Sequence, residues 1–84
     1  GADLIPLYRC RYPAGHFMGP DAKCEGQAID GILGYAHQSN KTGLYPLYRF
    51  VNRSGFHLET INYNEGIDNA FTLEGILGYV WPFF

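Results

Sequence analysis

Short runs of alternating apolar and polar residues, interrupted by glycine and proline, are the main pattern along the chain. From Leu47 to Val51, every second side chain faces the same side of an extended strand. Arg49 then shares a face with two aliphatic residues, so it needs a partner or a place at the margin of a sheet. Runs of this length predict β-strands joined by tight turns.

The pattern predicts about three short strands in each half of the chain. The first strands, at residues 4–11 and 44–52, are rich in β-prone residues and carry a proline near the start, where the missing N–H is tolerated. The return strands are expected at residues 17–18 and 56–61, and the closing strands at 29–36 and 71–81.

Turns and loops separate these strands. Glycine at the end of residues 13–15 and 53–55 accepts a positive φ, and proline presets a turn angle, so both segments favour turns. Residues 19–27 and 62–69 are polar and contain glycine. They are expected to be surface loops with at most one helical turn.

Two blocks of sequence occur twice in the same order. Pro-Leu-Tyr-Arg at residues 6–9 recurs at 46–49, and Gly-Ile-Leu-Gly-Tyr at 31–35 recurs at 75–79. These identities far exceed the match rate of roughly one in twenty per position that an even composition gives. The chain is therefore interpreted as a repeat unit at residues 4–37, a linker at 38–43 and a second unit at 44–84.

Charged residues recur in step with these blocks. Arg9 corresponds to Arg49, and the acidic residue before the last block is Asp30 in the first unit and Glu74 in the second. We expect an Arg–carboxylate pair in each unit, Arg9 with Asp30 and Arg49 with Glu74, that ties the first strand to the last.

The two cysteines fall in one unit only. Cys10 aligns with Phe50 and Cys24 with Asn64, so the second unit lacks both sulfur atoms. Joint absence is what a bonded pair predicts, and in the chain-entropy model such a loop stabilises the fold by about 3 kcal/mol. The alternative is two independent thiols buried as small hydrophobic groups. A disulfide indicates an oxidising, extracellular setting.

The length and composition bound the fold. At 84 residues and 9.5 kDa the chain has room for one small core. With 46% hydrophobic and 17% charged residues, it is not a disordered chain. The linker is too short to separate domains. We predict an all-β fold in which two pseudo-symmetric repeats of about three strands pack as a single disulfide-stapled domain, residues 1–84.

The charge pattern excludes some partners. Six basic and eight acidic residues are spread singly, giving a formal charge of −2 and no basic stripe for nucleic acid. No apolar run approaches the roughly 18 residues of a membrane span. The first residues have neither the basic nor the apolar region of a signal peptide, although a cleaved signal can precede them.

Motifs for catalysis, cofactors and metals are missing from the sequence. It contains no nucleophile elbow, phosphate-binding loop or zinc-protease motif, and no His-x-x-x-His or Cys-x-x-Cys pair. Asp30 and Glu74 occupy equivalent positions, so symmetric surroundings would not separate their pKa values as acid–base catalysis requires. We expect a protein that is not an enzyme and binds no cofactor or metal.

Aromatic residues make up 17% of the chain, and flat aromatic faces with planar polar groups are what sugar recognition requires. The candidate ligand residues are Tyr12, His16, Asp30, Tyr45, Asn52, His57, Tyr63, Asn64, Glu74 and Trp81. The repeated tyrosines, Tyr8 with Tyr48 and Tyr35 with Tyr79, are instead interpreted as packing residues rather than ligand platforms. His16 and His57 lie beside turns, where a bond to a nearby carbonyl, a ligand contact or a pH-responsive role would each explain them.

The repeated blocks resemble a family of secreted bacterial and fungal modules built from tandem units of about forty residues, of the form PLYR…GDHFYT…EGIxGYV. The resemblance covers residues 4–37 and 44–81. The family's Asp before His is replaced here by Gly15 and Phe56. The family is similar to non-catalytic attachments of extracellular hydrolases, which implies carbohydrate or cell-surface binding.

The sequence therefore favours a secreted, lectin-like module that binds a glycan or a cell-surface polysaccharide. The alternative is a protein-binding module, such as an inhibitor, a toxin-like effector or an assembly subunit. It would use the apolar end of the chain, residues 80–84, which is also a candidate homodimer seam.

Overall fold

The computed structural model describes residues 3–82, and all six strands predicted from the sequence are present. The elements are β1 (Leu4–Tyr12), β2 (Gly15–Gly19), the 3-10 turn η1 (Cys24–Gly26), β3 (Ala28–His37), β4 (Tyr45–Val51), β5 (His57–Thr60), α1 (Tyr63–Asp68) and β6 (Thr72–Val80). The six-residue α1 exceeds the single turn expected in that loop. No helix within residues 3–82 has the length and apolar character needed to cross a membrane.

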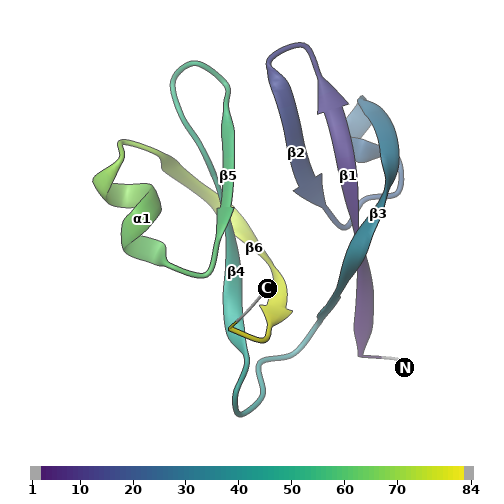
Figure 1. Ribbon diagram of the computed structural model, residues 1–84, viewed down its shortest axis with the longest axis vertical. Helices are drawn as coiled ribbons and strands as arrows, with labels where there is room; N and C mark the ends of the chain where they lie inside the picture. The colour runs from purple at the N-terminus through teal and green to yellow at the C-terminus, as the bar shows by residue number, and fades with distance from the viewer. Residues whose placement is uncertain (1–2, 83–84) are drawn as a thin grey trace.

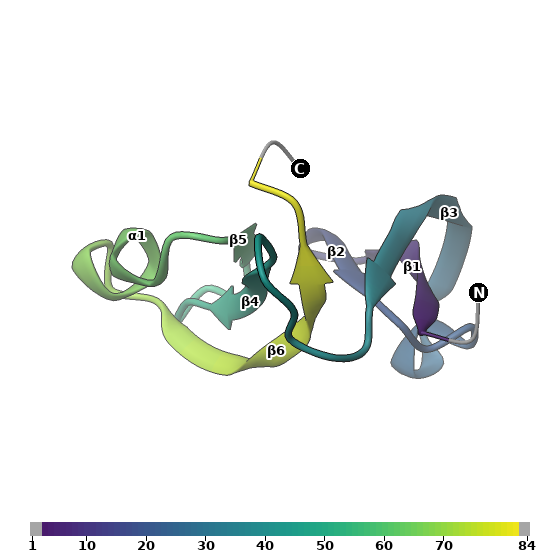
Figure 2. The same ribbon diagram turned by 90° about the horizontal axis from the view of Figure 1, so that it is seen from below.

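The six strands form one antiparallel sheet in the order β2-β1-β3-β6-β4-β5. At its centre, β3 and β6 meet through a single residue pair, His37 with Tyr79. Figure 1 shows the two three-stranded halves on either side of this seam, and Figure 2 shows the sheet curling. The edge strands β2 and β5 lie against each other, so the sheet nearly closes into a barrel.

Both halves pair their strands in the same register. In the first half the pairing of β1 with β3 slips by one residue at Leu33 and again at Asp30. In the second half the pairing of β4 with β6 slips at the corresponding Leu77 and Glu74. These slips are β-bulges, which bend a strand and re-aim the extra side chain. The register agrees with a duplicated unit, while an overall twofold symmetry stays a prediction.

The main core is shared by the two halves. It is formed by Leu7 and Ala36 from the first half and Leu47 and Val80 from the second, each at most 3% exposed. Burial of each leucine or valine side chain provides roughly 1.5–3 kcal/mol.

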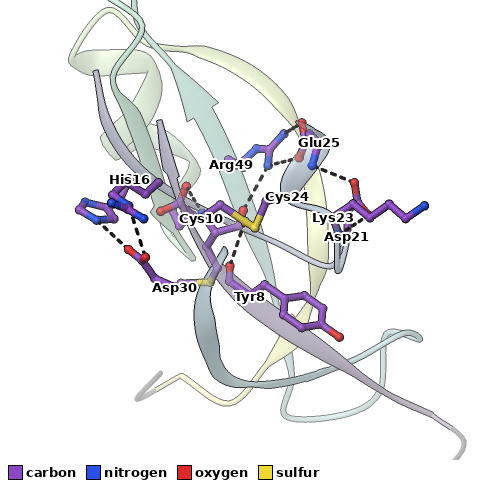
Figure 3. Close-up of a disulfide and its surroundings, with 12 residues drawn as sticks. Tyr8, Cys10, His16, Asp21, Lys23, Cys24, Glu25, Asp30 and Arg49 are labelled. Atoms are coloured by element: carbon purple, nitrogen blue, oxygen red, sulfur yellow. Dashed lines mark hydrogen bonds and ion pairs between the residues drawn. A yellow bond between two sulfur atoms is a disulfide. The ribbon is translucent and has the colours of Figure 1, made fainter. Parts of the chain in front are cut away.

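The predicted disulfide between Cys10 and Cys24 is confirmed, and it joins β1 to η1 (Figure 3). Both cysteines are fully buried beside Phe17. In the second half, Phe50 takes the register position of Cys10 and is also fully buried. Its ring lies directly against Gly66 of α1. One half thus fixes its connecting loop to the first strand with a covalent bond, and the other fixes it with an aromatic contact.

The linker is anchored to the start of β1. The carboxylate of Asp3 lies 3.0 Å from Lys41 Nζ and 2.8 Å from His37 Nδ1. The Lys41 ammonium and then the His37 ring lower the pKa of Asp3 to about 2. This contact accounts for the histidine at position 37, because the equivalent position of the second unit is Trp81.

We predict that Gly66→Ala destabilises the protein. A Cβ at this position would lie 2.5 Å from ring carbons of Phe50, and a fully buried ring has no room to move away. Overpacking of this kind costs about 1–3 kcal/mol, measured as a lower urea midpoint. Gly34→Ala is the matched control, because a Cβ there meets nothing within 4 Å. An equal loss in both variants would contradict the prediction.

Candidate ligand-binding site

The bulges place each acidic residue opposite a histidine of the hairpin. Asp30 Oδ2 lies 3.2 Å from His16 Nε2, and Glu74 Oε1 lies 3.1 Å from His57 Nε2. Each pair reaches across a middle strand. This strand is β1 in the order β2-β1-β3 of the first half and β4 in the order β6-β4-β5 of the second. Four of the ten candidate residues therefore form two equivalent His–carboxylate pairs (Figure 3 shows His16 with Asp30).

The predicted Arg–carboxylate pairs are present in one half only. Arg49 Nε donates to Glu74 Oε1 at 2.9 Å, which confirms the pair in the second unit. In the first unit Asp30 is instead bound by Arg11, at 3.4 Å, so the predicted Arg9–Asp30 pair is wrong. The reason is local: Arg11 corresponds to an apolar residue, Val51, in the other unit, and aspartate is one methylene shorter than glutamate.

Arg49 also joins the two halves of the protein. Its side chain is 11% exposed, and its Nη1 and Nη2 donate to the Glu25 carboxylate at 2.8 and 3.2 Å. Nη1 also donates to the Met18 carbonyl at 3.2 Å, and the guanidinium lies 5.1 Å from the centre of the Phe17 ring. Burial alone would lower the pKa of Arg49, but Glu25 and Glu74 outweigh it and raise the pKa.

Tyr12 and His57 continue this contact between the halves. The Tyr12 hydroxyl donates to the Gly55 carbonyl and lies 2.7 Å from His57 Nδ1. Both rings pack edge-on or tilted against Phe17, with centroids 5.5 and 5.2 Å away. Burial, then Glu59 and Glu74, raises the pKa of Tyr12. Tyr12, His57 and Glu74 are thus brought together, but in an interface that leaves little of His57 exposed.

A hollow of about 210 Å³ lies beside this interface. It is lined by residues of β1, β2, β3 and β5, namely Arg9, His16, Phe17, Met18, Leu33 and Glu59. Phe17 is 6% exposed, whereas the bulge residue Leu33 is 51% exposed. The hollow therefore combines apolar surface with a guanidinium, an imidazole and a carboxylate, and a small polar ligand with an apolar face fits this chemistry.

The pKa of the Glu59 carboxyl in the hollow is raised. Burial raises its pKa, and so does Glu74, while the Met18 N–H at 3.4 Å and Arg49 act in the opposite direction. Arg9 is exposed. Within residues 3–82, no carboxylate lies within ion-pair distance of its guanidinium.

The structure places the other candidate residues away from the hollow. Tyr45 and Trp81 lie at the end of the β4–β6 ladder, 48% and 49% exposed, with the Trp81 ring against Gly43. Asn52 supports the β4–β5 turn, since its Oδ1 accepts from the N–H groups of Ser54 and Phe56 at 3.0 and 2.9 Å.

The remaining two candidates belong to α1. The Tyr63 ring packs 5.3 Å from Tyr48 and 5.8 Å from Phe50. The Asn64 N–H donates to the capping Asn62 side chain at 3.1 Å. Packing accounts for the Tyr63 ring, whereas the Asn64 contact involves only its backbone.

Sequence reasoning found only one lining residue of the hollow, His16, and missed Arg9, Phe17, Met18, Leu33 and Glu59. The available signal was the presence of both Arg9 and Arg11 beside one Asp30, because one short carboxylate cannot engage two arginines and a histidine equally.

Comparisons with protein-family models, curated proteins and solved structures find no match for this chain. The resemblance to the tandem-repeat family therefore stays a prediction. Within the part of the chain that the structure describes, no three His, Cys, Asp or Glu side chains gather to hold a metal ion.

We predict that Glu59→Gln stabilises the protein at neutral pH. A carboxyl group whose pKa is raised by folding adds stability below its unfolded pKa and loses it as pH rises through the folded pKa. Gln keeps the acceptor for Met18 N without the buried charge. We expect a gain of about 0.2–1 kcal/mol at pH 7, the range for partly exposed charges, which shrinks as the pH falls to 4.

Urea denaturation at pH 7, 5 and 4 measures this effect. Glu65→Gln is the matched control, because Glu65 is exposed and its acceptor role toward Thr60 Oγ1 is kept by Gln. A gain for Glu59→Gln that is the same at every pH, or a loss at pH 7, would show that burial does not disfavour the ionised carboxyl.

Proposed function

We propose that the protein is a non-catalytic carbohydrate-binding module whose ligand surface is the hollow beside Arg9, His16, Leu33 and Glu59. The observation that carries the proposal is the composition of this hollow: a guanidinium, an imidazole and a carboxylate line it together with apolar side chains. A sugar ring has apolar C–H faces and hydroxyl groups around its edge, so its binding site needs both apolar contacts and hydrogen-bond partners.

The acidic residues support binding rather than catalysis. Asp30 is held by Arg11 and His16, and Glu74 by Arg49 and His57. Each carboxylate is thus already paired with two basic groups, whereas glycoside hydrolysis needs one protonated and one free carboxyl group flanking the substrate. The buried disulfide is compatible with an extracellular setting, where glycans and polysaccharides are available.

The test is a glycan-array and polysaccharide-binding screen with the folded protein, followed by affinity measurements on Leu33→Ala. Leu33 is 51% exposed, so the variant should fold, and loss of its apolar contact should weaken binding about fivefold. Ile32→Ala is the matched control, because Ile32 is 54% exposed on the same strand and does not line the hollow. No glycan hit, or equal losses in both variants, would remove the proposal.

A protein-binding module is the second candidate, and the exposed pair Tyr45 and Trp81 favours it. These rings lie where β4 begins and β6 ends. Residues 83–84, the last part of the apolar end that the sequence singles out, lie outside the described residues. Aromatic side chains on a surface are common anchors of protein interfaces.

We predict that Trp81→Ala leaves glycan binding unchanged and lowers any self-association or partner affinity, by about tenfold for an anchor of this kind. Analytical ultracentrifugation measures the self-association. Phe56→Ala, which removes an aromatic ring of similar exposure from the β4–β5 turn, is the control. A monomer at every concentration in both proteins would remove the homodimer.

A further inference from the structure

Arg9 and Arg49 occupy the same register position in the two halves but differ in their partners. Arg9 pairs with Gly31 across β1 and β3, as Arg49 pairs with Gly75 across β4 and β6. Arg49 is bound by two carboxylates, whereas Arg9 has none within residues 3–82 and lines the hollow. One guanidinium therefore holds the fold together, and its counterpart has donors available to a ligand.

The nearby acidic groups do not neutralise Arg9. Asp30, the counterpart of Glu74, is engaged by Arg11 at 3.4 Å and by His16 at 3.2 Å. Glu59 shares the hollow but lies beyond the 4.0 Å limit of an ion pair with Arg9. A guanidinium beside apolar surface attracts an anion with two coplanar oxygens, because its fork forms two parallel hydrogen bonds with such a group.

We infer that the hollow binds a sugar that carries a carboxylate, such as a hexuronate or a sialate. The inference rests on the proposed function and names the class of sugar. The ligand carboxylate would lie on Arg9, and the C–H face of the ring would cover Leu33 and Met18.

Glu59 sets the orientation of such a ligand. Its carboxylate repels the ligand's acidic group and accepts hydrogen bonds from hydroxyls, so the two ends of the sugar are distinguished. Partial burial of Glu59 strengthens this contact, because a half-desolvated acceptor gains more from a hydroxyl donor than one in water. A neutral sugar would leave the Arg9 guanidinium without its planar acceptor.

The experiment compares matched probes: trigalacturonic acid and sialyllactose, each with its methyl ester. Esterification keeps every hydroxyl group, removes the charge and adds one methyl group to each carboxyl. We expect each acid, or the one whose ring fits, to bind at least about tenfold more tightly than its ester, because a charge-assisted fork is worth about 1.5–3 kcal/mol. Isothermal titration calorimetry at low and physiological salt measures the difference.

Arginine variants assign the effect to one side chain. Arg9→Gln should abolish the preference for the acid, and Arg9→Lys, which keeps the charge without the fork, should retain only part of it. Arg53→Gln is the matched control, because Arg53 is exposed in the β4–β5 turn and does not line the hollow. Circular dichroism and urea midpoints show whether each variant folds.

The outcomes separate the inference from the proposed function. If the esters bind as well as the acids and Arg9→Gln changes nothing, the carboxylate inference is overturned while sugar binding stands. If neither acidic nor neutral glycans bind, the proposed function fails and the inference fails with it. If the Arg9 variants do not fold, NMR of the wild-type protein decides: acid-induced shifts at Arg9 Nε and at the Met18 and Glu59 amides support the inference, and shifts confined to other strands overturn it.

Discussion

The contact of Arg49 with Phe17, Glu25 and Glu74 is the interaction on which the rest of the structure depends. Within the described residues, β3 and β6 pair through one residue pair, His37 with Tyr79, so backbone hydrogen bonds alone hold the two halves of the sheet together weakly. A nearly buried guanidinium from β4 reaches two groups of the first half, the Glu25 carboxylate and the Met18 carbonyl, and covers the Phe17 ring. A nearly buried guanidinium needs hydrogen-bond and charge partners, and Arg49 takes them from both halves. Its contacts are therefore complete only when the two halves are packed together.

The same local device has different consequences in the two halves. A bulge in each closing strand presents an acidic side chain to a histidine two strands away. In the second half the longer Glu74 also reaches Arg49, and the pair becomes part of the interface. In the first half Arg11 competes successfully for Asp30, and Arg9 is left at the surface of a hollow. One duplicated pattern thus supplies a structural arginine and an arginine available for binding.

Loop attachment diverged in a similar way. Cys10–Cys24 and the Phe50–Gly66 contact join corresponding strands to their connecting loops. The disulfide acts mainly on the unfolded chain, whereas the aromatic contact depends on close packing in the folded state. The covalent attachment lies on the side that carries Glu25, so the loop that presents this carboxylate to Arg49 is held in place.

The sequence by itself determined the strands, the turns, the disulfide and the pairing of Arg49 with Glu74. Each follows from local alternation, from turn chemistry or from comparison of the two repeated units. Only the tertiary structure decided three features: the hollow, the Tyr12–His57 contact and the pairing of Asp30 with Arg11 in place of Arg9. They depend on how far the sheet curls and on which of several nearby basic side chains pairs with the carboxylate at a β-bulge. Strand pattern specifies which side chains share a face, but not which face meets the other half of the molecule, because curvature accumulates over all six strands.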